Sequence, residues 1–485
     1  MPDTPPTDTP SSARPVEPEA ALAGLWAAAG LPAGALDRVV LTGREPVLAS
    51  SFAVATAVQV SLAAAALAAA ELAVQRRAPA QTVTVDMARA ALDSCGHFSI
   101  DGRVPNPWDP LSGLYRCGAD VGAPGWVRIH ANFAHHRDGA LRLLGCPTGP
   151  TTDRAAVTAA LRRWSAEAFE DAAAEAGLVV AALRTFDAWD RHPQALALRA
   201  PAPLSIEPIP GAAPAAPRSW PALASAARPL HGLKVVDLTR ILAGPVAGRT
   251  LASFGAEVML VNAPNLPNIE AIADTSRGKL SAHVDLAQPA GRQALQALLR
   301  DSHVLLQSYR PGAIDRFGFG AEAAAALRPG IVHVSLSAYG FSGPWAARRG
   351  FDSLVQTATG FNHAEAEAAG LAEPKPMPLQ VLDYGAAYVL AFGAQAALWR
   401  QAREGGSWQV RVSLAGVGHW LRSLGRVPDG LQAVRPGFAA WLETVDSGFG
   451  RLAVMPPTAQ FSRTPAGWSR PSMPPGTHPP RWPDA

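Results

Sequence analysis

The chain has 485 residues, of which 48% are hydrophobic and 17% are charged, and it carries a formal net charge of +3. This balance excludes a disordered chain and a strongly basic nucleic-acid-binding protein. The length exceeds what one hydrophobic core normally serves, and it predicts two or three domains.

The N-terminal segment and the cysteines both favour a cytoplasmic protein. Residues 1–20 are rich in proline and acidic residues and lack the basic and apolar stretches of a signal peptide, so we expect a disordered leader. The three cysteines, Cys95, Cys117 and Cys146, are odd in number and lack the CxxC spacing of zinc sites. We therefore expect neither a disulfide framework nor a metal site.

Residues 21–200 contain an alanine-rich stretch, 52–70, that approaches the length of a membrane span. Thr56, Gln59 and Ser61 interrupt its apolar character. The stretch therefore predicts a buried helix rather than a membrane-spanning one.

Two proline-rich segments divide and end the chain. Residues 201–230 are dense in proline and alanine, which is typical of an extended linker. Residues 426–485 become proline-rich from Pro456 onward and predict a tail that wraps over the surface as coil.

Between these segments, residues 231–425 alternate apolar strands with helices. Strands that are apolar on both sides predict a parallel sheet with helices on both faces, that is, a doubly wound, Rossmann-like α/β domain. Ligands of such domains bind beyond the carboxyl ends of the strands. The loops expected to hold a ligand are 239–245, 308–320 and 337–352.

A partial internal repeat links the two halves. Residues 54–94 can be aligned with residues 382–423, since each contains a long alanine-rich helix, a basic polar turn, a strand and a second helix. We interpret the pattern as a partial duplication.

Asp383 is the one charged side chain in the apolar stretch from Pro378 to Trp399. An aspartate just before an apolar helix is typical of a helix N-cap. Its approximate counterpart in the repeat is Thr56, which also caps well, so the helix does not require a carboxylate there. The alternative is a nucleophile, because a carboxylate at a helix start is ionised and has backbone donors nearby.

Five motifs of the second half follow one another as GLKVVDLTRILAGPVAGRTLASFGAEV, SRGKLSAHVDLAQPAGRQAL, SYRPGAIDRFGFG, LSAYGFSGPWAARRGFDSLVQTATG and VLDYGAAY. Together they resemble family III CoA-transferases, which include formyl-CoA, carnitine and bile-acid CoA-transferases and the related α-methylacyl-CoA racemases. In the first half, TVTVDMARAAL resembles the strand and helix that enter the smaller α+β domain of the family, and SGLYRCGADVGAPGWVRIHANFAHHRDGALRLLGC resembles that domain's first strands and helix. Because that domain precedes the large one here, we interpret the chain as a fusion of two incomplete copies.

The resemblance implies that Asp383 is the nucleophile that carries the acyl group and then CoA. It implies no metal and no permanently bound cofactor, with coenzyme A or acyl-CoA as substrate. Guanidinium groups suit the phosphates of CoA. The residues that the resemblance implies to contact CoA are Arg316, Arg310, Lys279, Ile241, Leu242, Ala243, Arg349 and Phe351, the alternative being solvated surface charges or plain core packing.

Several positions depart from the family pattern. Asn262 and Ala263 stand where the family commonly has an acid and an arginine, so one contact with the nucleotide is missing or supplied elsewhere. Phe351 replaces the tyrosine of transferases and the catalytic histidine of racemases, and the racemase's second acid falls near Asn132. Racemisation is therefore disfavoured, since phenylalanine cannot move a proton. Three histidines are interpreted as ordinary polar residues: His363, His135 and His136.

We therefore expect a cytoplasmic CoA-transferase that moves CoA between two carboxylic acids. The alternatives are an acyl-CoA racemase or lyase and a degenerate, non-catalytic CoA-binding protein. We expect acyl-CoA and carboxylic acids as partners, with no nucleic acid and no membrane. Family members form interlocked homodimers, so a homodimer is expected, unless the fused half-copies provide that arrangement within one chain.

Overall fold

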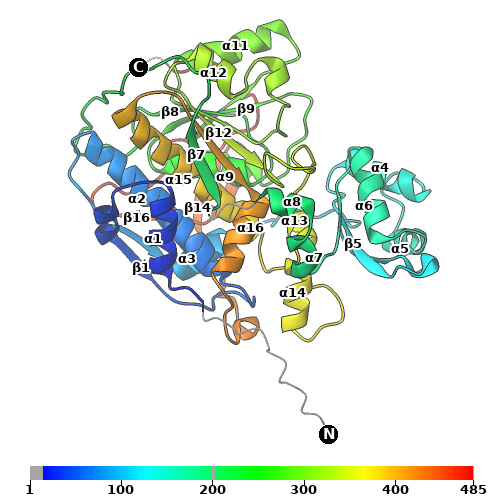
Figure 1. Ribbon diagram of the computed structural model, residues 1–485. Coiled ribbons are helices and arrows are strands. Elements are labelled where there is room, and N and C mark those ends of the chain that lie inside the picture. The colour runs from blue at the N-terminus through cyan, green and yellow to red at the C-terminus, as the bar shows by residue number, and fades with distance from the viewer. Residues whose placement is uncertain (1–14, 199–201, 484–485) are drawn as a thin grey trace.

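The computed structural model describes residues 15–198 and 202–483 (Figure 1). Its main body is built on a seven-stranded sheet. In spatial order the strands are β10 (Lys279–His283), β9 (Glu257–Asn262), β8 (Lys234–Asp237), β11 (Val304–Gln307), β12 (Val332–Ser337), β13 (Trp408–Ser413) and β7 (Leu204–Pro208). All neighbours pair in parallel except β7, which is antiparallel to β13.

Helices cover both faces of this sheet, as the alternation of strands and helices predicts. On one face α11 (Pro289–Arg300) and α12 (Ala321–Leu327) share a core with alternate strand residues such as Val236 and Leu305. On the other face α9 (Ala243–Ser253) and α15 (Val381–Glu404) pack against Val235 and Leu306. Buried strands with helices on both sides confirm the doubly wound α/β class. The sheet is mixed rather than wholly parallel, because β7 comes from the range for which the sequence predicts a linker.

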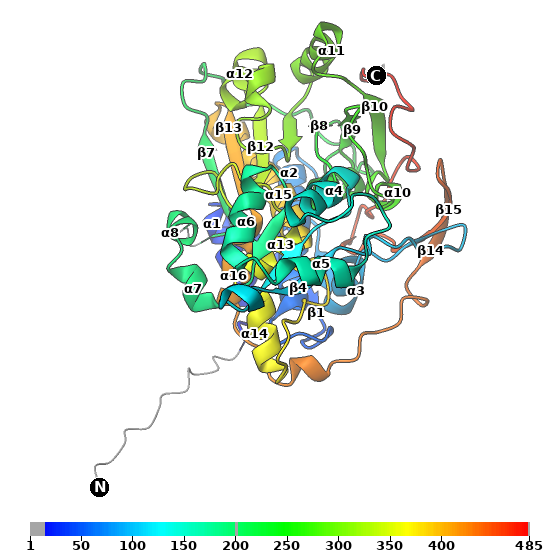
Figure 2. The ribbon, with the colours of Figure 1, turned by 90° about the vertical axis from the view of Figure 1, so that its right-hand side faces the viewer.

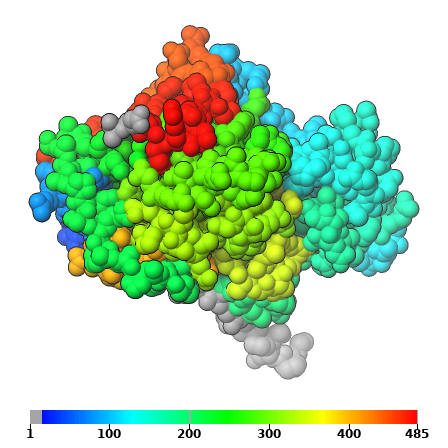
Figure 3. All heavy atoms as spheres, turned by 90° about the horizontal axis from the view of Figure 1, so that it is seen from above, coloured from blue at the N-terminus to red at the C-terminus, as the bar shows by residue number. Residues whose placement is uncertain are grey.

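The smaller α+β lobe is an antiparallel sheet covered by helices, with a hydrophobic core of its own. It contains β4 (Gly113–Cys117), β5 (Gly125–Ile129), β6 (Val180–Ala182), α4 (Ala134–Leu144), α5 (Arg154–Leu161) and α6 (Ala166–Glu175). The lobe projects from the main body in Figure 3, and in Figure 2 it lies over α13 (Asp352–Ala358), which packs against β5 and β6. The short helices α7 (Phe186–Asp190) and α8 (Pro193–Ala197) lead back to the large sheet.

The rest of the first half joins the large domain. Helix α2 (Val54–Gln75) packs directly against α15, and both belong to one continuous core. Both helices are long and apolar enough to cross a membrane, yet 94% of the most apolar window of each is buried inside the protein. The packed cores therefore do not divide the chain at residues 201–230.

The internal repeat has the same strand pairing in both copies. Strand β1 (Val39–Thr42) pairs in parallel with β2 (Val83–Asp86), and α2 connects them. Strand β12 likewise pairs in parallel with β13, and α15 is the last of the three helices between them. Each second strand is followed by a helix, α3 (Met87–Asp93) or α16 (Leu414–Ser423). This recurrence supports the interpretation of a partial duplication.

Each copy receives its antiparallel edge strand from the other half of the chain. Strand β7, which precedes the large domain, pairs with β13, whereas β16 (Gln460–Phe461), near the C-terminus, pairs with β2. Each half of the chain thus supplies the antiparallel edge strand of the sheet in the other half.

Parts of both chain ends form helices or strands where the sequence predicts coil. Residues 1–14 of the expected leader lie outside the described residues, but α1 (Pro18–Ala28) begins inside the expected range 1–20 and packs against α2. The tail forms a hairpin of β14 (Glu443–Ser447) and β15 (Gly450–Val454) that adds to β3 (Ser99–Ile100). The last described residues return over the edge of the large sheet, where the backbone N–H of His478 donates to Ser281. The remaining α-helices of the described residues are α10 (Ile272–Thr275) and α14 (Phe361–Ala368).

Candidate active site

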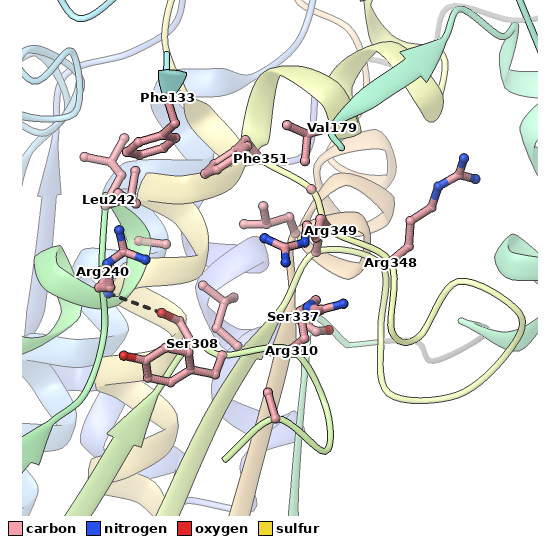
Figure 4. A pocket seen from close by; sticks show the side chains of 18 of the residues that line it. Phe133, Val179, Arg240, Leu242, Ser308, Arg310, Ser337, Arg348, Arg349 and Phe351 are labelled. Carbon is pink, nitrogen blue, oxygen red and sulfur yellow. Dashed lines mark hydrogen bonds between the residues drawn. The ribbon is translucent and has the colours of Figure 1, made fainter. Parts of the chain in front are cut away.

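A cavity of about 370 Å³ lies where the carboxyl ends of the central strands meet the small lobe (Figure 4). The three loops that the sequence singles out all contribute to its wall, and α4 and β6 border it from the lobe. Its lining includes Phe133, His135, His136, Val179, Arg240, Ile241, Leu242, Ala243, Ser308, Arg310, Arg316, Ser337, Arg349, Phe351 and Asp383. All the residues predicted to belong to the site except Lys279 thus lie in this wall.

Asp383 occupies the first turn of α15 and is partly exposed to the cavity. It is not the N-cap of the helix, since Gln380 holds that position and has no capping side-chain bond. Within the described residues no hydrogen bond reaches the carboxylate of Asp383, whereas its backbone N–H donates to Asp352 Oδ2 at 2.9 Å. The N-cap interpretation of Asp383 is therefore wrong, and the carboxylate is free to meet a ligand.

Asp352 begins α13 and is fully buried beneath Asp383. Its carboxylate accepts hydrogen bonds from the backbone N–H groups of Leu382 and Asp383 and from the side chain of Gln356. Burial raises the pKa of Asp352 to about 7 against the effect of these bonds. Burial and the charge of Asp352 raise the pKa of Asp383 well above its ordinary value. The two carboxyl groups therefore titrate as a pair.

Four arginines, Arg240, Arg310, Arg316 and Arg349, give the cavity a strongly positive wall. None of them forms an ion pair with a carboxylate in the part of the chain that the structure describes. In Figure 4 the guanidinium groups of Arg240 and Arg349 project into the cavity. Burial lowers the pKa of Arg349, and neighbouring Arg310 lowers it further, so the positive charges repel one another without a ligand. The wall is suited to a polyanion.

Arg348, beside them, has a different role. It stacks over Trp345 with its guanidinium carbon 4.1 Å from the ring centroid and forms ion pairs with Glu170 and Asp171 of the small lobe. This side chain points away from the centre of the cavity in Figure 4. It ties the lobe to the large domain.

The loop after β8 carries a strained backbone. Ile241 has φ of +80°, a conformation that is an outlier for a β-branched residue. Such strain persists where the surroundings hold it, and it concentrates at functional sites. Here it brings Ile241, Leu242 and the start of α9 against the cavity.

Aromatic and histidine side chains form a second part of the wall, next to Arg240 and Arg349. Phe351 stacks on His130 with ring centroids 4.0 Å apart, and Phe133 lies beside both rings. His136 is buried, and neither ring nitrogen has a hydrogen-bond partner within the described residues. Burial, and then the neighbouring charge of His135, lowers the pKa of His136 to about 3, so it is neutral at physiological pH. His135 and His136 therefore line the site, contrary to their interpretation as ordinary polar residues.

Other predicted positions lie elsewhere. Lys279 is fully buried under α9, where its ammonium lies 2.8 Å from Asp237 and donates to the carbonyl of Pro245. The prediction that Lys279 contacts CoA is therefore wrong. Asn132 accepts hydrogen bonds from Ser112 and the backbone of Asp109, outside the cavity wall. His363 pairs at the surface with Glu367.

Sequence reasoning did not single out Asp352, Arg240, Phe133 or Val179 as site residues. Asp352 and Arg240 fall in loops that were expected to hold the ligand, so their position in those loops was a signal. Phe133 and Val179 come from the small lobe. No spacing in the sequence links the lobe to Asp383.

Residues 230–425, which contain this site apart from its lobe wall, match CoA-transferase family III. This segment is therefore similar to family III CoA-transferases. The chain is 38% identical over 216 residues to "Acetyl-coenzyme A transferase nodX" of Hypoxylon pulicicidum, covering 42% of this chain and 36% of that protein. It is 32% identical over 211 residues to "Probable fatty acyl-CoA transferase Rv3272" of Mycobacterium tuberculosis, covering 41% and 53%.

A third relative is "Succinate--glutarate CoA-transferase" of Agrobacterium fabrum, 30% identical over 209 residues, with 39% of this chain and 52% of that protein covered. Among solved structures, the chain is similar to the crystal structure of Rv3272 from Mycobacterium tuberculosis at 32% identity and a TM-score of 0.38, covering 41% of this chain and 58% of that one. The matched segment spans about a third to a half of the curated relatives' length.

Proposed function

We propose that this protein is a CoA-transferase that moves coenzyme A from an acyl-CoA to a carboxylic acid, with Asp383 as the covalent carrier. The observation that carries the proposal is a carboxylate without hydrogen-bond partners in the described structure, facing a cavity walled by unpaired arginines. The family III match of the same segment supports it.

The reaction consists of two exchanges at Asp383. A carboxylate oxygen attacks the thioester carbonyl; a C–O bond forms, the C–S bond breaks, and CoA leaves as thiolate with the bonding electron pair. The thiolate then attacks the aspartyl carbonyl of the mixed anhydride, which releases the donor acid and leaves an aspartyl-CoA thioester. An acceptor carboxylate runs the same steps in reverse. The thioester bond is exchanged rather than hydrolysed, so the reaction needs no external energy source.

The arginine wall and the aromatic wall would bind different parts of acyl-CoA. Arg316, Arg310, Arg240 and Arg349 would bind the phosphates of CoA, because guanidinium groups donate paired hydrogen bonds to phosphate oxygens. The aromatic wall around Phe351 would cover the acyl group and keep water from the anhydride. Excluding water matters because hydrolysis of either intermediate would waste the thioester.

A racemase or lyase fits the site less well. Racemisation requires an acid and a base on opposite sides of the α-carbon. Phe351 has no titratable group, and Asn132 is engaged outside the cavity. The second alternative, a CoA-binding protein without catalysis, differs from the transferase in leaving Asp383 unmodified.

Trapping of the covalent state tests the proposal. Incubation with acyl-CoA and hydroxylamine should convert Asp383 to its hydroxamate, read by mass spectrometry of the peptide that contains it, and Asp383→Asn should abolish both labelling and transfer. Asp187→Asn is the matched control, because it removes an acid from the first turn of α7 at the exposed surface. Binding of CoA without modification of Asp383 across a range of acyl-CoAs would refute the transferase. A cytoplasmic location and a homodimer stay predictions.

A further inference from the structure

Both copies of the internal repeat begin their long helix on a carboxylate from another segment of the chain. In the second copy, Asp352 accepts the backbone N–H groups of Leu382 and Asp383 at the start of α15. In the first copy, Glu45 accepts the backbone N–H groups of Ala55 and Thr56 at the start of α2, the latter at 2.8 Å. In both places the acid satisfies donors that have no partner within the helix. Capping therefore explains a hydrogen-bond acceptor at each position.

The residue whose backbone N–H donates to the capping carboxylate differs between the copies. In the first copy it is Thr56, whose hydroxyl donates to the same Glu45 at 3.2 Å, so the two side chains attract. In the second copy it is Asp383, whose carboxylate has no proton to donate when it is ionised. Two acids thus lie next to each other where the other copy has an acid and an alcohol. Capping alone does not require this repulsive pair.

We propose that Asp352 is a positioning residue whose buried negative charge destabilises ionised Asp383 and thereby favours its acylation. This inference rests on the proposed transferase function. Before reaction the ionised pair carries two negative charges; after acylation Asp383 is neutral and one charge has left with the CoA thiolate. The repulsion is therefore present in the ground state and absent from both covalent intermediates, which is how ground-state destabilisation speeds a step.

Hydrogen-bond donors and one arginine stabilise the ionised form of Asp352 against the effect of its burial. Two backbone N–H groups and Gln356 donate to it, and Arg128 of β5 attracts it from the small lobe. Asp383 has no such bonds among the described residues. Arg184, which follows β6 and also faces α13, is already paired with Glu170. Arg349 and neutral His136 face the pair from the cavity wall.

A direct titration tests the inference without relying on turnover. The carboxyl carbon of Asp383 is followed by NMR in protein labelled with ¹³C-aspartate, with the signal assigned by its loss in Asp383→Asn. In Asp352→Asn the amide oxygen can still accept the backbone N–H groups, but the charge is gone. The titration midpoint of Asp383 should then fall by about one pH unit or more. The matched control Glu45→Gln removes the corresponding charge from the other copy and should leave the midpoint unchanged. An equal midpoint in the wild type and Asp352→Asn overturns the inference.

The hydroxylamine assay supplies the catalytic readout. With saturating acyl-CoA at a pH where Asp383 is ionised in every variant, Asp352→Asn should lower the rate of hydroxamate formation about tenfold, the equivalent of one pKa unit. Glu45→Gln should label at the wild-type rate. Labelling of the wild type with no loss in Asp352→Asn overturns the inference but leaves the transferase intact. A wild type that never labels refutes the transferase itself.

Discussion

Arg249 of α9 lies 3.1 Å from Asp93 at the end of α3, and this ion pair joins the segment that matches CoA-transferase family III to the first half of the chain. Both side chains are largely buried, and Arg249 also pairs with Asp274. Tyr388 of α15 donates to Asp93 as well. The contact between the repeat copies therefore contains a charged network beside its apolar helix packing.

Asp93→Asn should weaken this network. Arg249 keeps Asp274 as a partner, so we expect the free energy of unfolding to fall by about 1–3 kcal/mol, the range for losing a buried charged hydrogen bond. Urea denaturation measures it. Asp190→Asn, which removes an exposed pair with Arg422, serves as the control and should cost no more than about 1 kcal/mol. Equal losses in the two variants would contradict a special role for the buried pair.

Lys279→Met should destabilise the fold rather than the ligand complex. The substitution leaves Asp237 fully buried without its ammonium partner, and removing one member of a buried ion pair costs about 3–5 kcal/mol. Chemical denaturation reports this loss, and calorimetry at a temperature where the variant is folded should give an unchanged dissociation constant for CoA. A large loss of affinity for CoA in the folded variant would instead indicate that Lys279 contacts CoA.

Arg316→Gln should weaken CoA binding about tenfold, because a charge-assisted bond to phosphate is replaced by a neutral one. The salt dependence of binding should become shallower in the same variant. Isothermal titration at two ionic strengths measures both effects. Arg300→Gln, on the exposed side of α11, should behave as the wild type. An Arg316 variant that matches it would remove this side chain from the CoA site.

Acid should destabilise the protein partly through His303. Burial lowers the pKa of His303 to about 3, and its Nδ1 accepts the backbone N–H of Lys234. The unfolded chain takes up a proton near pH 6.5 and the folded chain does not, so stability falls as the pH drops from about 6.5 towards 3. The His303→Gln variant should be less stable than the wild type at pH 7, but its free energy of unfolding should fall less on acidification. Denaturation curves between pH 4 and 7 check the slope.

The location of the site could be predicted from the sequence more completely than the set of residues that form it. Parallel strands bring their carboxyl ends to one edge, so the loops at 239–245, 308–320 and 337–352 were expected to meet, and they do. Lys279 was misplaced because the direction of a strand side chain depends on its neighbours, and here it points under α9 to Asp237.

Contacts distant in sequence account for the other failures. Phe133 and His136 reach the cavity only through the packing of the small lobe on α13, which no local pattern encodes. The antiparallel strand β7 was hidden in a proline-rich segment because its partner, β13, lies some two hundred residues further along. The repeat was visible in the sequence, but the exchange of edge strands between its copies was not.

That exchange makes the two parts of the polypeptide mutually dependent for folding. A gene divided within the exposed stretch around residues 211–222 would yield one fragment lacking β16 and another lacking β7. Each would present an open sheet edge and an uncovered alanine-rich helix, so the fragments should be insoluble when made separately and soluble when produced together. A protease cut at the same place in the finished protein should leave both pieces bound to each other.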